Sequence, residues 1–362
     1  MTETSVQIHR WLLPLSWIYG GAVWLRNKFF DWGILPSESF QAPVICIGNL
    51  AVGGTGKTPH TEYLIRLLQQ AGMQVSVLSR GYKRKTRGYL LADASSTASQ
   101  IGDEPCQMKQ KFPQARIAVD ADRREGIARL LQLDHPPTDV ILLDDAFQHR
   151  YVKAGLNILL TDYRRLFTED CLLPAGRLRE SVSGKDRAQI VIVTKCPQDM
   201  KPIDFNITEK QLGLYPYQQL YFTRIRYGMP VPLFPQEAEG QPISSVLSGE
   251  ECVLLVTGIA SPQPLVEEVQ LYARQVKLLP FADHHDFSDK DLQLIAEEFS
   301  QMEGCKRLII TTEKDGARLK SHPLLSEDLK PYIHVIPIEV EFLLNQQESF
   351  NQNIIGYVRK NS

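Results

Sequence analysis

One short stretch restricts the fold of this chain more than any other: GNLAVGGTGKT at residues 48–58, directly after the apolar run PVICI. It matches the P-loop pattern, with Ala51 in place of the first glycine. In a P-loop, glycines let the backbone curl so that its N–H groups point at phosphate oxygens, and the next helix adds its positive end. The stretch therefore predicts a buried strand, a phosphate-binding loop and a helix, in this order.

The loop positions have distinct expected roles. Lys57 should reach the β- and γ-phosphates, and the Thr58 hydroxyl should ligate Mg²⁺. A chance glycine-rich turn is the alternative, and the flanking strand and helix argue against it. The residues expected to bind the nucleotide are Ala51, Val52, Gly53, Gly54, Thr55, Gly56, Lys57 and Thr58. The chain is thus expected to bind a nucleoside triphosphate with Mg²⁺.

A second apolar strand, DVILLDD at 139–145, ends in Asp144 and Asp145. P-loop proteins keep a second metal partner at the end of such a strand. The two aspartates could instead cap the next helix. We expect one of them to contact the metal, and the sequence does not decide which.

The rest of the chain has an alternating pattern of predicted strands and helices. From residue 43 short apolar strands alternate with amphipathic helices, which predicts a parallel sheet covered on both faces. Prolines cluster near 200–250, where QQLYFTRIRYGMPVPLF predicts a β-ribbon connector. The alternation then resumes, with a strand predicted at 333–340 and a helix at 344–358. The expected organisation is an N-terminal segment (residues 1–35), a P-loop domain (36–210), a linker (211–240), a second α/β domain (241–340) and a C-terminal segment (341–362) that packs on the first domain.

Composition excludes some classes of protein. With 362 residues the chain can form two medium domains, and a formal net charge of −2 gives no overall attraction to nucleic acid. The six cysteines contain no CxxC pair, which argues against a zinc ribbon and a disulfide framework and favours a reduced, cytoplasmic setting. We expect no nucleic-acid partner and a monomer.

The N-terminal run WLLPLSWIYGGAVWL at 11–25 is apolar, rich in tryptophan and flanked by cations. It is too short to span a bilayer comfortably, and Pro14, Gly20 and Gly21 are expected to break a straight helix. A buried helix and an element at the membrane interface both fit this stretch.

Three further segments carry candidate chemistry without deciding its kind. LSRGYKRKTRGY at 78–89 could be a solvated basic loop, or could bind RNA, an anionic co-substrate or an anionic lipid. IGDEP at 101–105 predicts a loop whose Asp103 or Glu104 could cap a helix or accept a hydroxyl proton. FADHHDF at 281–287 could be a helix-entry loop, or could direct one imidazole at a carboxylate base.

Together these segments resemble one family. GNLAVGGTGKTP, LSRGYKR, GDEP, DDAFQHR, LLPAGRLRE and FADHH occur in the order and spacing of the tetraacyldisaccharide 4′-kinases, also called lipid A 4′-kinases. The N-terminal segment and TTEKDGARL at 311–319 are also similar, so the resemblance covers roughly residues 8–345. Many members carry glycine where Ala146 stands here.

The resemblance implies a membrane-associated kinase with two α/β/α domains, of which the first is a P-loop NTPase-type sandwich and the second is smaller, joined by a two-stranded linker. It would move the γ-phosphoryl group of ATP, with Mg²⁺, to the 4′-hydroxyl of a tetraacylated glucosamine disaccharide 1-phosphate. This activity belongs to lipid A synthesis at the cytoplasmic face of the inner membrane. The resemblance implies that residues 1–35 form a membrane-interface segment, through which the protein is a peripheral or monotopic membrane protein.

The family motifs also imply roles for single residues. Asp103 corresponds to the catalytic base and His284 to its partner, although His285 beside it is a second candidate. Lys57 and Asp145 are the other two candidate catalytic residues, Lys57 as a contact to phosphate and Asp145 as a contact to the metal and the reacting centre. Thr58, Asp144, Asp145 and Glu180 are candidate metal ligands. The candidate substrate contacts are Arg80, Tyr82, Arg124, Gln148 and His149.

Two rival functions stay open from the residues alone. One is a P-loop ATPase or GTPase switch, such as a partitioning or metal-insertion factor at a membrane surface. VIVTKC at 191–196 resembles the base-reading TKxD segment of GTPases, but Cys196 and Pro197 leave no aspartate there. The other is a peripheral membrane-binding module with a vestigial nucleotide site, and the retention of Lys57, Thr58 and both aspartates argues against it.

Overall fold

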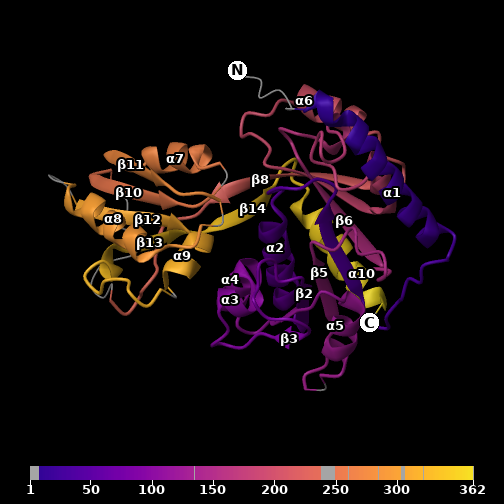
Figure 1. The fold of residues 1–362 in the computed structure, drawn as a ribbon, viewed down its shortest axis with the longest axis horizontal. Coiled ribbons are helices and arrows are strands. Elements are labelled where there is room, and N and C mark those ends of the chain that lie inside the picture. The colour runs from indigo at the N-terminus through magenta and orange to yellow at the C-terminus, as the bar shows by residue number, and fades with distance from the viewer. Residues whose placement is uncertain are drawn as a thin grey trace. The chain divides into compact units, whose positions relative to one another are not determined.

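The computed structural model describes residues 8–361 except 134, 238–248, 260, 284, 303–305 and 321. The chain forms two compact units (Figure 1). The first unit comprises Met1–Ile101, Met108–Ile225 and Val340–Ser362, and the second comprises Gly102–Gln107 and Arg226–Glu339. Most of the second unit is therefore an insertion between two segments of the first.

A nine-stranded sheet forms the centre of the first unit. Its spatial order is β14 (Ile338–Phe342), β8 (Gln219–Tyr227), β7 (Ile190–Thr194), β6 (Leu156–Asp162), β1 (Val44–Asn49), β5 (Val140–Asp144), β2 (Val75–Ser79), β4 (Arg116–Val119) and β3 (Leu90–Leu91). From β8 to β4 all neighbours are parallel, and β3 is antiparallel to β4. Every residue of β1, β2, β5 and β7 is buried, as expected for strands covered on both faces.

Helices cover this sheet. They are α1 (Leu13–Asp31), α2 (Lys57–Gln70), α3 (Ala98–Ile101), α5 (Arg123–Leu131), α6 (Pro202–Leu212) and α10 (Gln347–Asn361), with 3₁₀ turns η1 (Arg10–Leu12), η2 (Phe167–Glu169) and η3 (Val182–Arg187). Helix α4 (Asp103–Lys111) leads from the short Gly102–Gln107 segment back into the first unit. Helix α10 lies against the start of β1, because the Tyr357 hydroxyl donates to the Val44 carbonyl at 3.2 Å.

The second unit has its own five-stranded sheet. Its order is β11 (Gln275–Pro280), β10 (Glu251–Thr257), β12 (Lys306–Thr312), β13 (Ile333–Ile336) and β9 (Val231–Pro232), and its helices are α7 (Gln263–Gln270), α8 (Asp289–Ser300), α9 (Glu313–Lys320) and the 3₁₀ turn η5 (Lys330–Tyr332). Val253 and Leu255 belong to one apolar cluster, and Leu254 and Val256 to another. Since alternate residues of a strand face opposite ways, both faces of β10 are covered.

The predicted α/β class with mostly parallel sheets is confirmed. Two local predictions were wrong. The strand predicted at 333–340 is interrupted at Pro337: β13 pairs with β12 of the second unit, whereas β14 neighbours β8 in the large sheet. The predicted β-ribbon is likewise divided, because β8 pairs with β7 and β9 pairs with β13.

The expectation that the N-terminal run would break its helix was also wrong, because α1 is continuous from Leu13 to Asp31. Pro14 lies in the first turn, where its missing N–H has no intrahelical partner in any case. At Gly20 an added Cβ would approach Leu172 Cδ1 to 2.7 Å. The glycine therefore permits close packing of α1 on the first unit.

The cysteines partly meet the sequence expectation. Cys46, Cys106, Cys171 and Cys196 are free thiols, but Cys252 is disulfide-bonded, so not every cysteine is reduced in the structure. Cys305 lies outside the described residues.

Candidate active site

The loop between β1 and α2 has the curled backbone that its glycines predicted. Gly53 (φ 111°) and Gly56 (φ 82°) occupy the left-handed region, which side-chain-bearing residues rarely adopt. The Asn49 amide donates to the Thr55 hydroxyl at 2.7 Å and fixes the loop to the end of β1. Lys57 and Thr58 follow in the first turn of α2. The eight predicted nucleotide-binding residues 51–58 therefore run without interruption from the loop after β1 into the first turn of α2, at the carboxyl end of the sheet.

The two aspartates after β5 lie at this same edge but differ in their surroundings. Asp144 is buried and accepts hydrogen bonds from the hydroxyls of Thr61 at 3.1 Å and Ser79 at 3.4 Å. Asp145 has a side chain that is 35% exposed, and its Oδ1 lies 3.8 Å from Lys57 Nζ. Asp145 is thus the aspartate that faces the P-loop lysine.

A second cation holds Asp145. Arg179 Nη2 lies 2.7 Å from Asp145 Oδ1, and the same guanidinium donates to the Asn49 backbone and side-chain oxygens. Burial raises the pKa of the Asp145 carboxyl, but Lys57 and Arg179 outweigh burial and hold that pKa below its ordinary value. Asp145 is therefore ionised at neutral pH and available to positively charged partners.

Glu180, a candidate metal ligand, is buried beside this cluster. Both of its carboxylate oxygens accept from Arg187 Nη2 at 2.8 Å. The amides of Gln148 (2.9 Å) and Asn27 of α1 (3.2 Å) also donate to it. Glu180 connects α1 to the edge of the site, and its role toward a metal stays a prediction.

The DDAFQHR segment places Gln148 and His149 next to these groups. Gln148 Nε2 donates to the Asn49 carbonyl at 2.8 Å, so it contacts the end of β1 directly. Burial lowers the pKa of His149 to about 4, and the positive charge of Arg123 acts in the same direction. His149 is therefore a neutral imidazole, and its buried Nε2 has no hydrogen-bond partner among the described residues.

The remaining predicted substrate contacts lie at the surface. Arg80 follows β2 directly and is exposed, and Tyr82 is 65% exposed with Lys83 Nζ 5.9 Å from its ring centre. Arg124 pairs with its neighbour Asp122 at 2.8 Å and stacks over Tyr151. These side chains can reach solutes, and nothing in their contacts selects a particular ligand.

Sequence reasoning missed two arginines of the first unit. Arg179 was passed over in favour of Glu180, although it holds Asp145. Arg123 was passed over in favour of Arg124, yet it is the buried one: its Nη1 donates to the Asp120 carbonyl at 2.8 Å. Burial lowers the pKa of Arg123, while the negative charge of Asp144 opposes this. The sequence offers little to identify either arginine in advance. Charged residues are rarely buried without a partner, and these partners are known only from the structure.

In the second unit, Asp103 lies in the first turn of α4, so the predicted IGDEP loop is a helix start. Carboxylates are favoured there by the helix dipole, and Pro105 is tolerated in the first turn. Asp103 forms a salt bridge with the buried Arg318, which also pairs with Asp315 at 3.2 Å. Asp315 in turn accepts from the Gly258 backbone N–H and the Thr312 hydroxyl, each at 2.8 Å. The TTEKDGARL motif thus anchors the side chain of Asp103.

His284 lies outside the described residues. Its neighbour His285 has a clear local role, because its Nε2 lies 2.9 Å from Asp291 and its ring stacks on Phe281. Asp291 also accepts from Ser288 in the capping box that opens α8. These contacts show that His285 stabilises the start of α8.

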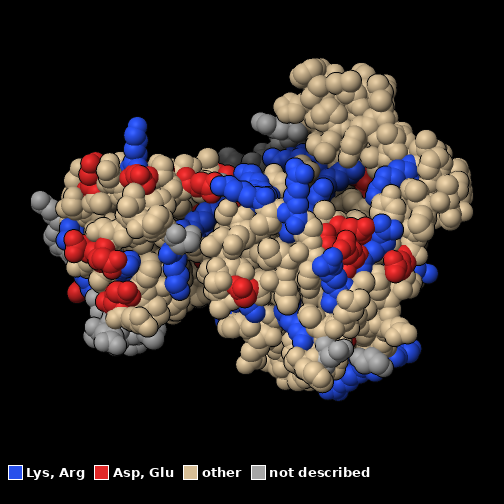
Figure 2. Space-filling model, turned by 60° about the horizontal axis from the view of Figure 1, so that its bottom comes forward, with Lys and Arg blue, Asp and Glu red and all other residues tan. Residues whose placement is uncertain are grey.

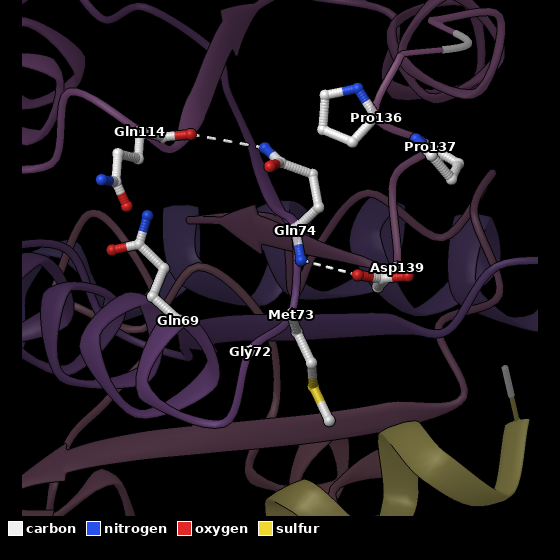
Figure 3. Close-up of a pocket in the computed structure, with 8 residues that line it drawn as sticks. All are labelled: Gln69, Gly72, Met73, Gln74, Gln114, Pro136, Pro137 and Asp139. Atoms are coloured by element: carbon white, nitrogen blue, oxygen red, sulfur yellow. Dashed lines mark hydrogen bonds between the residues drawn. The ribbon is translucent and has the colours of Figure 1, made fainter.

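A pocket lies at the other edge of the large sheet (Figure 3). Gln74 and Asp139 directly precede β2 and β5, and the Gln74 N–H donates to Asp139 Oδ2 at 2.6 Å. In the close-up, the Gln74 amide also reaches the Gln114 carbonyl, at 3.3 Å. Because the P-loop follows the carboxyl end of β1, this pocket at the amino ends of the parallel strands is separate from the candidate active site.

No helix among the described residues has the length and apolar character needed to cross a bilayer.

Comparison with known proteins matches the chain to one family. The family model described as Tetraacyldisaccharide-1-P 4′-kinase matches residues 8–359. A tetraacyldisaccharide 4′-kinase of Bacteroides thetaiotaomicron is 60% identical over 369 residues, covering 100% of this chain and 96% of the relative. One from Bacteroides fragilis is 61% identical over 363 residues, with the same coverage. A crystal structure of LpxK from Aquifex aeolicus in complex with ATP superimposes with a TM-score of 0.73 at 27% identity, covering 97% of this chain and 99% of that one.

Proposed function

Because the chain belongs to the tetraacyldisaccharide-1-P 4′-kinase family, we propose that it transfers the γ-phosphoryl group of ATP to the 4′-hydroxyl of a tetraacylated glucosamine disaccharide 1-phosphate. This reaction is a step of lipid A biosynthesis. The observation that carries the proposal is the P-loop lysine, Lys57, next to the ionised Asp145 at the carboxyl edge of the large sheet. That arrangement suits binding of a nucleoside triphosphate, and the family match supplies the acceptor.

The residues at this edge fit a magnesium ion. Thr58 offers a hydroxyl in the first turn of α2, and Asp144 and Asp145 offer carboxylates at the end of β5. Hydroxyl and carboxylate oxygens are the ligands that Mg²⁺ prefers, and the ion is usually held by one or two carboxylates together with substrate phosphates. When bound, the ion would neutralise phosphate charge.

Phosphoryl transfer needs a proton acceptor for the attacking hydroxyl, and we assign this role to Asp103. As the sugar oxygen bonds to the γ-phosphorus, the bond from that phosphorus to the β-phosphate oxygen breaks, ADP leaves, and the hydroxyl proton passes to Asp103. Arg318 positions this carboxylate, because the salt bridge between the two side chains fixes its orientation. His284 is the proposed partner by family correspondence.

The GTPase rival is not favoured. In a TKxD segment the base-reading aspartate would stand at position 197, two residues after Lys195, and this chain has Pro197 there. A proline offers no carboxylate to a guanine base.

The function is tested with purified protein, Mg-ATP and tetraacyldisaccharide 1-phosphate in detergent. We expect consumption of ATP only when the lipid is present and a product heavier by one phosphate, read by mass spectrometry. ATP hydrolysis to free phosphate that does not depend on lipid would contradict the proposal and favour an ATPase.

We further propose that α1 docks the enzyme, as a monomer, on the cytoplasmic face of the inner membrane. The helix is held on the first unit by side chains along one face: Ser16 bonds Leu172, Tyr19 bonds Arg179, and Asn27 bonds Glu180. Large apolar side chains stay exposed: Trp11 (78%), Leu15, Trp17 (72%), Ile18, Trp24 and Trp32. Apolar side chains turned outward on a helix attached by polar contacts fit a lipid surface.

Charge supports this docking surface. On the first unit, Figure 2 shows a large projection almost without charged side chains, and Lys and Arg gather beside it. Arg10, Arg26 and Lys28 flank the tryptophans in the sequence. When aromatic rings insert into the membrane interface, neighbouring cations lie at the level of the anionic lipid head groups and are attracted to them. The acyl chains of the substrate would stay in the bilayer, since each buried methylene contributes about 0.8 kcal/mol.

The variant Trp11→Glu/Trp17→Glu/Trp24→Glu tests this docking. An aromatic side chain buries about 150–250 Å², so at about 25 cal/mol per Å² three fully buried tryptophans would supply roughly 11–19 kcal/mol. We therefore expect the variant to lose sedimentation with anionic vesicles and turnover on vesicle-embedded lipid, while turnover on detergent-solubilised lipid persists because the inward face of α1 is unchanged.

The matched control is Leu271→Glu/Tyr272→Glu, which removes two exposed apolar side chains of the second unit. It should bind vesicles as the unmodified protein does. Equal vesicle binding by the triple tryptophan variant would refute the docking role of α1.

A further inference from the structure

Three consecutive carbonyl groups of the P-loop are each held by a side chain. The Gly54 oxygen accepts from Lys195 Nζ, the Thr55 oxygen from Thr194 Oγ1 at 2.9 Å, and the Gly56 oxygen from His60 Nδ1 at 2.7 Å. In a planar trans peptide the N–H points away from the C=O. Fixing the Gly56 carbonyl therefore also fixes the direction of the Lys57 N–H, at the position where a P-loop presents N–H groups to phosphate.

His60 contacts a second group in addition to the loop carbonyl. It is 3% exposed, and its Nε2 lies 3.0 Å from the hydroxyl of Thr223, which is fully buried. A carbonyl oxygen only accepts, so Nδ1 carries the proton and Nε2 accepts from Thr223.

Thr223 belongs to β8, and this strand has a special place in the chain. Its backbone oxygen accepts from the Cys196 N–H at 3.0 Å, so Thr223 is itself fixed to the end of β7. Two residues later, after Ile225, β8 passes from the first unit into the second. His60 is thus a direct bridge from the loop carbonyl to the strand that connects the units.

We propose that His60 is a positioning residue for nucleotide binding, which orients the Gly56–Lys57 peptide through Nδ1–H and ties it to β8 through Nε2. The inference rests on the proposed function only in requiring that the P-loop binds ATP. It assigns a role to the residue that follows GKTP, which the P-loop pattern itself does not specify.

Two substitutions separate the two ends of the ring. In His60→Asn the amide nitrogen can occupy the place of Nδ1 and donate to Gly56, whereas in His60→Gln the amide reaches toward Thr223 instead. Isothermal calorimetry with Mg-ATP, without lipid, measures the affinity. We expect His60→Ala and His60→Gln to raise the Kd about tenfold, as for loss of one buried hydrogen bond, and His60→Asn to restore most of the affinity.

Thr223→Val tests the second contact with little change of side-chain shape, and it also removes the weaker contact of this hydroxyl with the Val193 carbonyl at 3.4 Å. We expect a smaller rise in Kd, about two- to fivefold, and no further rise when it is combined with His60→Gln. The control is Thr208→Val, which removes a buried hydroxyl that donates to the Asp204 carbonyl within α6. Its Kd should equal that of the unmodified protein.

Thermal unfolding of each variant separates positioning from stability. If His60→Asn and His60→Gln have the same Kd, or if His60→Ala binds ATP normally, the positioning role is wrong. If Thr223→Val binds ATP as the unmodified protein does, the tie to β8 is wrong. Failure of the unmodified protein to bind Mg-ATP would instead overturn the proposed function, and this inference with it.

Discussion

Asp103→Asn is expected to lower kcat by about 10²–10⁴-fold, the usual contribution of a general base, while the Kd for Mg-ATP stays nearly unchanged. The amide keeps the size of the carboxylate but cannot accept the hydroxyl proton. The fold should persist, because Arg318 retains its second partner Asp315 at 3.2 Å. Steady-state kinetics on detergent-solubilised lipid, together with calorimetry on Mg-ATP, measure the two quantities separately.

The adjacent carboxylate provides the control. Glu104 shares the first turn of α4, and Glu104→Gln removes the same charge one residue away. Its kcat should stay within about twofold of the unmodified enzyme, since no transferred proton is assigned to it. Near-normal turnover of Asp103→Asn would rule out Asp103 as the base. If Asp103 and His284 act as a unit, their double alanine variant should be little slower than either single variant.

Lys57→Met is expected to impair both nucleotide binding and turnover. The ammonium group neutralises phosphate charge in the bound state and more strongly as charge moves in the transition state, so kcat should fall by about 10²–10³-fold and the Kd for ATP should rise about tenfold. Asp145 keeps Arg179 at 2.7 Å, so the variant does not leave this carboxylate without a cation. Single-turnover kinetics with saturating lipid give the rate of the chemical step.

Lys153→Met is the matched change at an exposed lysine of the same unit, and it should leave both constants unchanged. A Lys57→Met variant that lost only ATP affinity, with full kcat at saturating ATP, would show that the lysine binds the ground state and the transition state equally.

The features of the site that sequence predicted are those with local signals. The turn at 51–58 follows from glycines between an apolar strand and a helix, and all of these features are neighbours in the chain. Asp144 and Asp145 follow from a strand that ends in carboxylates. The sequence could not separate the two aspartates, because their difference comes from Thr61, Ser79 and Arg179, which are distant in sequence.

Tertiary packing explains the failed predictions. Gly20 is destabilising in an isolated helix, but in the structure it admits Leu172. The apolar run at 333–340 resembles one strand because hydrophobic periodicity is the same in both sheets, and only the partners of β13 and β14 divide it. Arg123 and Arg124 are equivalent by composition, and burial alone distinguishes them. In each case the deciding contact is with a residue far along the chain.

The insertion of the second unit between β8 and β14 has a consequence for biosynthesis. A ribosome releases residues 226–337 before β14 and α10, so most of the inserted unit can fold while the large sheet still lacks an edge strand and the Tyr357–Val44 contact. During that interval β8 has no partner on its outer side. The first unit is therefore completed last. Nascent chains arrested shortly after residue 339 should expose the edge of β8, which chaperones can bind.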